Sequence, residues 1–178
     1  MKNMLRVAIL GPESTGKTEL AKSLAEYFQV DWVPEFARAY VESLSRPYEY
    51  EDVCRIAAHQ IDEELFYENH PSDGKKFVFF DTDLIITKVW FDYKYGKVPK
   101  FLQERLNCHF FDFYLLCYPD LPWQPDSVRE HGDDREFFFN WYKQEIKKTG
   151  KSVSIITGIG NERLQNAIRA LTSFVRYL

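Results

Sequence analysis

The chain has 178 residues, a length close to that of one domain, so we expect residues 1–178 to form a single domain. Its net charge of -4 argues against a general nucleic-acid-binding protein, because such proteins usually carry a basic surface. The sequence contains no apolar leader at its start and no stretch that approaches a membrane span. We therefore expect a cytoplasmic protein without a membrane partner.

Short apolar runs alternate with amphipathic segments along the chain. The first run, at 7–10, is continuously apolar and ends at Gly11, which is typical of a buried parallel strand. Apolar residues then recur at helical spacing from Lys17 to Phe28. The other expected strands lie at 31–34, 77–80, 113–117 and 153–156, and the other expected helices span 35–44, 51–68, 84–93, 99–107, 135–148 and 161–177.

This alternation predicts a doubly wound α/β fold, in which helices cover both faces of a parallel sheet. Ligands of such folds bind beyond the carboxyl ends of the strands. The longest irregular segment runs from Tyr118 to Asp134 and contains three prolines followed by charged residues. Because long loops inside compact domains often cover active sites, we predict that this segment is a lid loop.

Residues 11–18 match the P-loop pattern G-x-x-x-x-G-K-[ST] at every fixed position, between a predicted strand and a predicted helix. In this motif the backbone N–H groups bind phosphate oxygens, the lysine reaches the β- and γ-phosphates, and the hydroxyl residue ligates Mg²⁺. The motif therefore predicts that ATP and Mg²⁺ bind here. The predicted nucleotide contacts are Gly11, Glu13, Ser14, Thr15, Gly16, Lys17 and Thr18.

Two carboxylates follow the predicted strand at 77–80. Asp81 stands at the strand end, where P-loop proteins place the carboxylate that orients Mg²⁺, so Thr18 and Asp81 are the predicted metal ligands. Asp83 precedes an apolar helical run and suits the N-cap of that helix. It is the weaker candidate for contact with a second substrate.

Glu35 and Arg38 follow the short predicted strand at 31–34. In a kinase, Glu35 could hydrogen-bond the attacking hydroxyl and accept its proton, while Arg38 could pair with Glu35 or hold a phosphate. Alternatively, Glu35 only complements the dipole of the following helix and Arg38 is its surface partner. The residues alone leave both interpretations open.

The predicted lid carries Arg129 and Arg135 on either side of His131. Phosphoryl transfer requires positive charge around the transferred group, and a closing loop can bring arginines to it. We therefore predict that both arginines stabilise the transition state, although a solvated mixed-charge loop is the alternative. Trp90 and Tyr93 could stack on a base or a pyridine ring, but aromatic residues at helical spacing usually belong to the core.

Taken in order, several blocks resemble the ribosylnicotinamide kinase domain of NadR-type proteins, and the resemblance covers nearly the whole chain. These blocks are GPESTGKT at 11–18, VPEFAR at 33–38, FDTDL at 80–84, WFDYKYG at 90–96, PWQPD at 122–126 with DDR at 133–135, and Thr157-Gly158 ahead of Glu162-Arg163-Leu164.

The resemblance implies ATP-dependent phosphorylation of the 5′-hydroxyl of nicotinamide riboside, which yields nicotinamide mononucleotide in NAD salvage. It also implies a five-stranded parallel sheet and favours Glu35 as the base, with Asp81 as its rival. The sequence lacks the H-x-G-H signature and the helix-turn-helix domain of larger NadR proteins. We therefore expect neither adenylyl transfer nor operator binding.

The predicted kinase site combines these residues. The catalytic candidates are Lys17, Glu35, Asp81, Arg129 and Arg135, and the substrate-binding candidates are Glu35, Arg38, Asp83, Trp90 and Tyr93. A kinase for another nucleoside or nucleotide remains an alternative, as does a P-loop switch or sensor, although the sequence has no N-K-x-D guanine reader. A homo-oligomer is compatible with the sequence.

Overall fold

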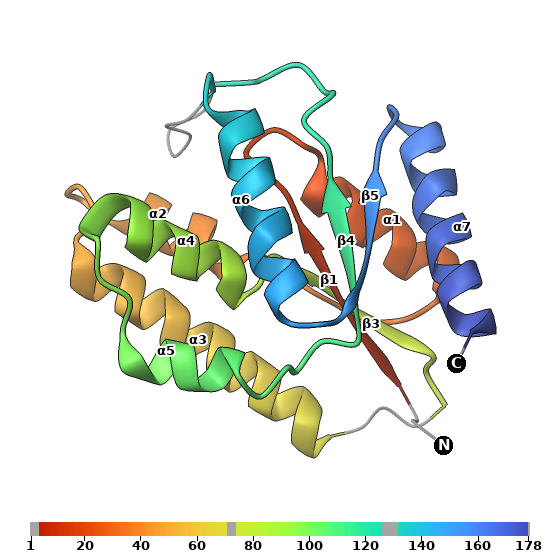
Figure 1. Cartoon of the computed structure of the whole chain (residues 1–178), viewed down its shortest axis with the longest axis horizontal. Helices are drawn as coiled ribbons and strands as arrows, with labels where there is room; N and C mark the ends of the chain where they lie inside the picture. The colour runs from red at the N-terminus through yellow and green to blue at the C-terminus, as the bar shows by residue number, and fades with distance from the viewer. Residues whose placement is uncertain (1–3, 71–73, 126–131, 178) are drawn as a thin grey trace.

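A computed structural model describes residues 4–70, 74–125 and 132–177 (Figure 1). All strands and helices expected from the apolar pattern are present, with ends displaced by no more than two residues. The elements are β1 (Leu5–Leu10), α1 (Lys17–Phe28), β2 (Trp32–Val33), α2 (Phe36–Ser43), α3 (Tyr50–Asn69), β3 (Phe77–Asp81), α4 (Leu84–Tyr95), α5 (Lys100–Leu106), β4 (Phe113–Cys117), α6 (Arg135–Lys148), β5 (Ser152–Ile156) and α7 (Asn161–Arg176).

The strands form one five-stranded sheet in the order β2-β3-β1-β4-β5, with parallel pairing throughout. This confirms the predicted parallel α/β fold. In the register, Ile9 of β1 lies opposite Asp81 of β3, while Leu10 lies opposite Leu116 of β4. The P-loop that follows β1 therefore begins between the carboxyl ends of β3 and β4.

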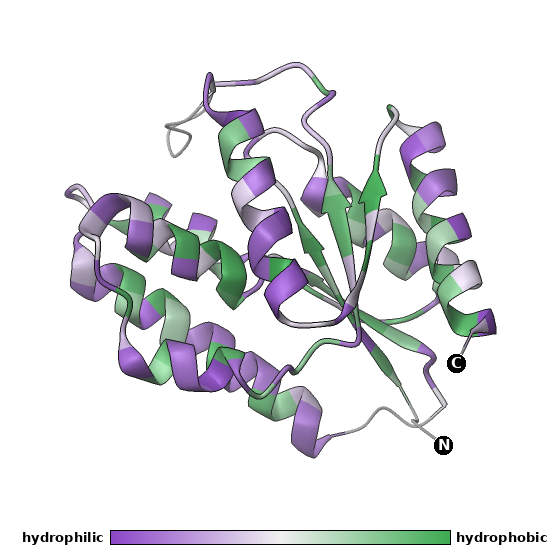
Figure 2. Ribbon diagram, in the orientation of Figure 1, coloured by the Kyte–Doolittle hydropathy of each residue, from purple (hydrophilic) through white to green (hydrophobic). Residues whose placement is uncertain are grey.

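The core lies on both faces of the sheet, and β1 shows why its sequence is apolar without interruption. Val7 and Ile9 pack toward α1 and α7, whereas Ala8 and Leu10 pack toward α4 and α6. All four side chains are fully buried. Figure 2 shows the resulting green strands between helices whose hydrophilic residues face outward. Full burial of one large aliphatic side chain contributes about 1.5–3 kcal/mol.

In an outer helical layer, α3 and α5 pack on α4, and α2 packs on α3 (Figure 1). Val53 of α3, Phe91 of α4 and Leu102 of α5 are fully buried in its core. At the start of α3, Asp52 accepts hydrogen bonds from Arg46 at 2.6 Å and from the Glu49 backbone N–H at 2.8 Å. These bonds fix the loop before α3, which borders a large cavity.

The strand β5 differs from the continuous burial that its apolar run indicated. Val153 and Ile155 remain 37% and 42% exposed, because β5 lies at the edge of the sheet. Only Ile156 is fully enclosed in this strand. Within the three described stretches, no helix combines the length and apolar character needed to cross a bilayer.

Candidate active site

The P-loop folds tightly against the end of β4. Gly11 has a φ of 155°, and a Cβ at this position would come within 2.8 Å of both the Cys117 carbonyl oxygen and the Thr15 hydroxyl. Gly16 has a φ of 73°, in the left-handed region that favours glycine. The Thr15 hydroxyl donates to the Pro12 carbonyl at 2.8 Å and closes the loop. Local sterics therefore explain why the motif requires glycine at both positions.

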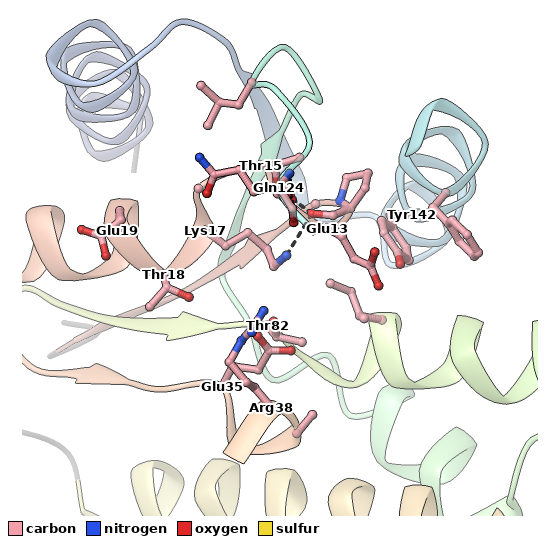
Figure 3. Close-up of a pocket in the computed structure, with 18 of the residues that line it drawn as sticks. Glu13, Thr15, Lys17, Thr18, Glu19, Glu35, Arg38, Thr82, Gln124 and Tyr142 are labelled. Carbon is pink, nitrogen blue, oxygen red and sulfur yellow. Dashed lines mark hydrogen bonds between the residues drawn. The ribbon is translucent and has the colours of Figure 1, made fainter. Parts of the chain in front are cut away.

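Lys17 is the first residue of α1 and extends across the P-loop (Figure 3). Its Nζ donates to the Pro12 carbonyl at 3.0 Å. Gly16 supplies no side chain to cap the helix, so the first N–H groups of α1 face the loop. Because a helix N-terminus carries partial positive charge, this arrangement suits an anionic group such as a phosphate.

Thr18 and Asp81 lie side by side next to the P-loop. The Thr18 hydroxyl donates to Asp81 Oδ2 at 2.5 Å, whereas the buried Asp81 Oδ1 has no hydrogen-bond partner. Burial raises the pKa of Asp81, and the positive charge of Lys17 opposes this shift. One hydroxyl and one carboxylate fit Mg²⁺, which usually completes its coordination with waters and substrate phosphates. In the described part of the chain, no cluster of three or more His, Cys, Asp or Glu forms a metal site by itself.

Glu35 occupies the N-cap position of α2 but does not use its side chain as a cap. It lines the large cavity together with Arg38, across from Lys17 (Figure 3). Burial raises the pKa of Glu35, Lys17 lowers it, and the nearby Asp81 raises it again. Arg38 forms an ion pair with Glu42 at 3.7 Å, one turn further along α2. The structure therefore places Glu35 on the wall of the cavity that contains the P-loop, and its role as a base stays a prediction.

A large cavity among the described residues has a volume of about 680 Å³ and contains the whole P-loop in its wall. The sheet order divides this cavity, because β1 and its P-loop lie in the middle. On one side, which we call the β2–β3 half, Glu35 and Arg38 line it near the ends of β2 and β3. On the other side, the β4–β5 half, Leu121 and Ile159 line it in the loops that follow β4 and β5.

Aromatic side chains line the cavity beside α4 and α6. Trp90 and Tyr93 belong to this lining, as predicted, and so do Tyr48 and Tyr142. The Trp90 indole N–H donates to the Tyr48 hydroxyl at 3.1 Å, and the two rings meet edge to face. The sequence did not indicate Tyr48 or Tyr142. Tyr48 stands in an aperiodic loop, whereas helical spacing made Tyr142 resemble an ordinary core residue.

Asp83 lies away from the large cavity. Its Oδ1 accepts a hydrogen bond from the Ile85 backbone N–H at 2.9 Å, which confirms the predicted N-cap of α4. The side chain is only 3% exposed, and burial followed by repulsion from Glu64 raises its pKa to about 8. Asp81 also lies behind Thr18 rather than on the cavity wall. The placement thus does not support a substrate contact for Asp83.

The arginines of the predicted lid have different outcomes. Arg129 and the neighbouring His131 lie outside the described residues. Arg135 begins α6, and its guanidinium donates to the Leu121 carbonyl at 2.7 Å. In the described part of the chain, Arg135 supports the segment after β4 instead of lining the large cavity. Its predicted contact with the transferred group stays a prediction.

Comparison with curated proteins gives relatives of one kind. The trifunctional NAD biosynthesis/regulator protein NadR of Salmonella typhimurium (strain LT2) is 32% identical over 151 residues, which are 80% of this chain and 35% of that protein. The protein of the same name from Escherichia coli (strain K12) is 34% identical over 143 residues, covering 75% and 33%. The chain therefore spans about a third of the length of the curated relatives it matches.

Solved structures agree with this result. A NadR protein in complex with NR has a TM-score of 0.75 at 26% identity and covers 96% of this chain and 51% of its own. A NadR protein in complex with NAD and AMP-PNP has a TM-score of 0.69 at 26% identity, with coverage of 96% and 49%. Thymidylate kinase from Ehrlichia chaffeensis, at 16% identity and a TM-score of 0.64, shares the fold.

A family model described as an AAA domain, AAA_28, matches residues 6–163. This match covers the P-loop, Glu35, Asp81 and the loops after β4 and β5. Together with the NadR relatives, it confirms the resemblance predicted from the sequence blocks. The chain therefore belongs to the AAA domain family, as a nucleotide-binding P-loop protein whose relatives include the NadR proteins.

Proposed function

We propose that residues 1–178 form one cytoplasmic P-loop kinase domain that transfers the γ-phosphoryl group of ATP to the 5′-hydroxyl of nicotinamide riboside. The product would be nicotinamide mononucleotide, in the salvage of NAD. The cavity carries this proposal, because it joins a phosphate-binding loop to a carboxylate and to several aromatic rings. The structural relative in complex with NR supports the choice of acceptor.

The donor phosphates would bind the P-loop. The P-loop lines the cavity and leads into the N-terminus of α1, whose free N–H groups suit a phosphate, and Lys17 adds a full positive charge. Lys17 Nζ also donates to the Pro12 carbonyl at 3.0 Å. A phosphate is a stronger acceptor than a neutral carbonyl, so ATP would draw Lys17 from Pro12 toward the β- and γ-phosphates.

Thr18 and Asp81 would hold Mg²⁺, since their hydroxyl and carboxylate lie beside the phosphate loop and one carboxylate oxygen lacks a partner. When bound, Mg²⁺ neutralises part of the phosphate charge. Asp81 is buried behind Thr18, whereas Glu35 lines the cavity itself. This difference favours Glu35 over Asp81 as the group that meets the acceptor.

The oxygen of the acceptor 5′-hydroxyl would attack the γ-phosphorus, and Glu35 would accept the proton of that hydroxyl. The bond between the γ-phosphorus and the bridging oxygen breaks, and ADP leaves with the electron pair. Proton transfer to a positioned carboxylate typically contributes about 10²–10⁴-fold to a rate. Burial raises the pKa of Glu35, and the positive charges of Lys17 and then Arg38 oppose this shift and favour the ionised form.

The nicotinamide ring would lie against the aromatic residues of the β2–β3 half. Trp90 and Tyr93 come from α4, and the hydrogen bond from Trp90 to Tyr48 fixes one edge of this surface. The ring of nicotinamide riboside is a pyridinium cation, and cations bind favourably to aromatic faces.

The proposal is tested by measuring ADP release from Mg·ATP with and without nicotinamide riboside, beside a panel of ordinary nucleosides and nucleotides. We expect stimulation by nicotinamide riboside and a product heavier by one phosphoryl group. Stimulation by another nucleoside alone would replace the acceptor and keep the kinase. Equal ADP release with every acceptor would favour a nucleotide switch or sensor instead.

A further inference from the structure

Arg163, the third residue of α7, is a buried arginine that the proposed reaction does not use. Its side chain is 4% exposed, although arginine is rarely buried unless its donors are paired. Nε donates to the Gly158 carbonyl at 2.8 Å and Nη1 to the Ile156 carbonyl at 3.3 Å. Nη2 donates to the Tyr118 carbonyl at 3.2 Å and also pairs with Asp120.

These bonds join two loops that are far apart in the sequence. Tyr118 and Asp120 follow β4, while Ile156 ends β5 and Gly158 follows it. The Asp120 carboxylate completes the link, because its second oxygen accepts the Gly158 backbone N–H at 2.7 Å. Charge-assisted bonds of this kind are stronger than neutral ones. The Arg163–Asp120 pair thus fixes the loops after the two neighbouring strands β4 and β5, which Figure 1 shows side by side.

Both loops continue directly into the cavity wall. Leu121 follows Asp120, and Ile159 follows Gly158. Leu121 lies over the P-loop, since its Cδ1 would be 3.1 Å from a Cβ placed on Gly16. Ile159 is 65% exposed and lines the cavity, so its side chain is available to a ligand. The β4–β5 half therefore presents apolar side chains next to the phosphate site.

The geometry of the cavity assigns a ligand group to this half. If the triphosphate lies along the P-loop and the acceptor occupies the β2–β3 half, then the nucleoside of the donor must extend over β4 and β5. A flat base is largely apolar on its faces and packs well on aliphatic side chains. Leu121 and Ile159 provide such surfaces at the right end of the cavity.

We propose that Arg163 is a positioning residue for the donor base: with Asp120 it fixes Leu121 and Ile159 in the places where they hold the base of the nucleoside triphosphate. The inference rests on the proposed use of a nucleoside triphosphate as donor but not on the identity of the acceptor. Arg163 touches no reacting atom, because its donors are directed at the two loops.

The test separates the base from the phosphates. Affinities of the full chain for Mg·AMP-PNP, which has a base, and for Mg·tripolyphosphate, which has none, are measured by calorimetry for the wild type and for Arg163→Lys. A lysine keeps the charge but cannot reach all four acceptors. We expect about tenfold weaker binding of AMP-PNP, because small displacements of Leu121 and Ile159 would reduce their contact with the base. Binding of tripolyphosphate should be unchanged.

Two further variants make the test decisive. Asp120→Asn removes the charge from an exposed position, so this variant should fold. It should weaken the binding of AMP-PNP but not of tripolyphosphate, by a smaller factor than Arg163→Lys does. Arg176→Lys, on an exposed turn at the far end of α7, is the matched control and should bind both ligands as the wild type does. In turnover, the first two variants should raise KM for ATP and leave kcat at saturating ATP nearly unchanged.

The outcomes against the inference are distinct from those against the proposed function. Equal losses for AMP-PNP and tripolyphosphate would show general damage to the phosphate loop, and no loss for either would show that the loops need no such support. Both results overturn the inference. If Arg163→Lys fails to fold, Asp120→Asn decides by the same two affinities. A wild-type chain that binds neither ligand would instead refute the proposed function.

Discussion

The two halves of the cavity use their polar side chains in opposite ways. In the β2–β3 half, Glu35 faces the cavity without capping its helix, and Asp81 keeps an unpartnered oxygen. In the β4–β5 half, the guanidinium groups of Arg135 and Arg163 bond to backbone carbonyls of the protein. One half therefore keeps charged groups for a ligand, whereas the other uses them to shape an apolar surface.

This contrast suggests that the two halves on either side of the P-loop have different roles. Groups that must change protonation or coordinate an ion need oxygen atoms that the protein leaves unbonded, even though their burial costs free energy. Groups that only hold a flat ring need fixed positions, and buried hydrogen bonds provide them. The P-loop lies between the halves and serves both. Variants in each part should therefore change different kinetic constants.

Lys17→Ala should produce the largest effect, because Lys17 serves the transferred phosphate itself. Removal of one preorganised donor to a developing charge typically lowers kcat by about 10²–10³-fold. We expect a loss at the upper end of this range, with a cooperative thermal transition close to that of the wild type. Steady-state ADP release and calorimetry measure both quantities.

Lys22→Ala is the matched control for Lys17, since Lys22 lies on the same helix with its side chain 52% exposed. This variant should keep wild-type turnover. Full activity of Lys17→Ala would refute the assigned phosphate contact.

Glu35→Gln should lower kcat by about 10²-fold while Mg·AMP-PNP affinity changes little, because the amide keeps the shape of the side chain but cannot accept the proton. Single-turnover kinetics with nicotinamide riboside would measure the chemical step. Glu42→Gln, on the exposed side of α2, serves as the control. A parallel loss of nucleotide affinity would assign Glu35 to the donor side, and the proposed difference between the two halves would then be wrong.

The pH profile provides a second test of Glu35. Burial raises the pKa of Glu35 above its ordinary value of 4.5, although Lys17 opposes the shift. A base must be ionised to act, so kcat/KM for the acceptor should fall as the pH falls through this raised pKa. The acid limb should therefore lie above pH 4.5 in the wild type and disappear in Glu35→Gln. An unchanged limb in the variant would assign the titration to another group.

Residues whose role depends on near neighbours in the sequence were predictable. The P-loop, Asp81 at a strand end and Asp83 as an N-cap are set by the local chain, and the structure places all of them as the patterns indicated. Tyr48 reaches the cavity only because Asp52 fixes its loop and Trp90 of another helix bonds its hydroxyl. Such a position depends on tertiary packing, which no periodicity records.

The roles of the arginines also depend on tertiary packing that the sequence does not record. Arg135 was predicted to meet the transferred phosphoryl group because a lid arginine often does. Its charge was visible in the sequence, but its acceptor, the Leu121 carbonyl, was not. Arg163 appeared only within a block that resembled a known family. The structure gives it four acceptors in two loops, and this geometry alone indicates a role.

Trp90→Leu should raise KM for the acceptor by about tenfold without changing KM for ATP, since the loss of one aromatic face against a ring costs about 1–3 kcal/mol. Trp90→Phe keeps a ring but removes the N–H donor to Tyr48, so its effect should be smaller. Phe101→Leu, an aromatic change on α5 at 40% exposure, is the control. An increase in KM for ATP alone would place the donor base in the β2–β3 half.

Ser14 should give the smallest effect, because its hydroxyl joins the P-loop to the β4–β5 half without touching either proposed substrate ring. The hydroxyl donates to the Gln124 carbonyl at 3.3 Å and accepts the Gln124 N–H at 3.1 Å. Ser14→Ala should lower the free energy of unfolding by about 1 kcal/mol, the usual net value of a hydrogen bond.

Ser14→Gly separates that hydrogen bond from backbone strain. Ser14 has a φ of 56°, where glycine avoids the steric cost of a Cβ, which is about 1–2 kcal/mol for other residues. Ser14→Gly should therefore be as stable as Ser14→Ala or more stable, even though both lack the hydroxyl. Denaturant unfolding measures the difference. A glycine variant less stable than the alanine variant would show that φ at this position carries little strain and that chain entropy decides instead.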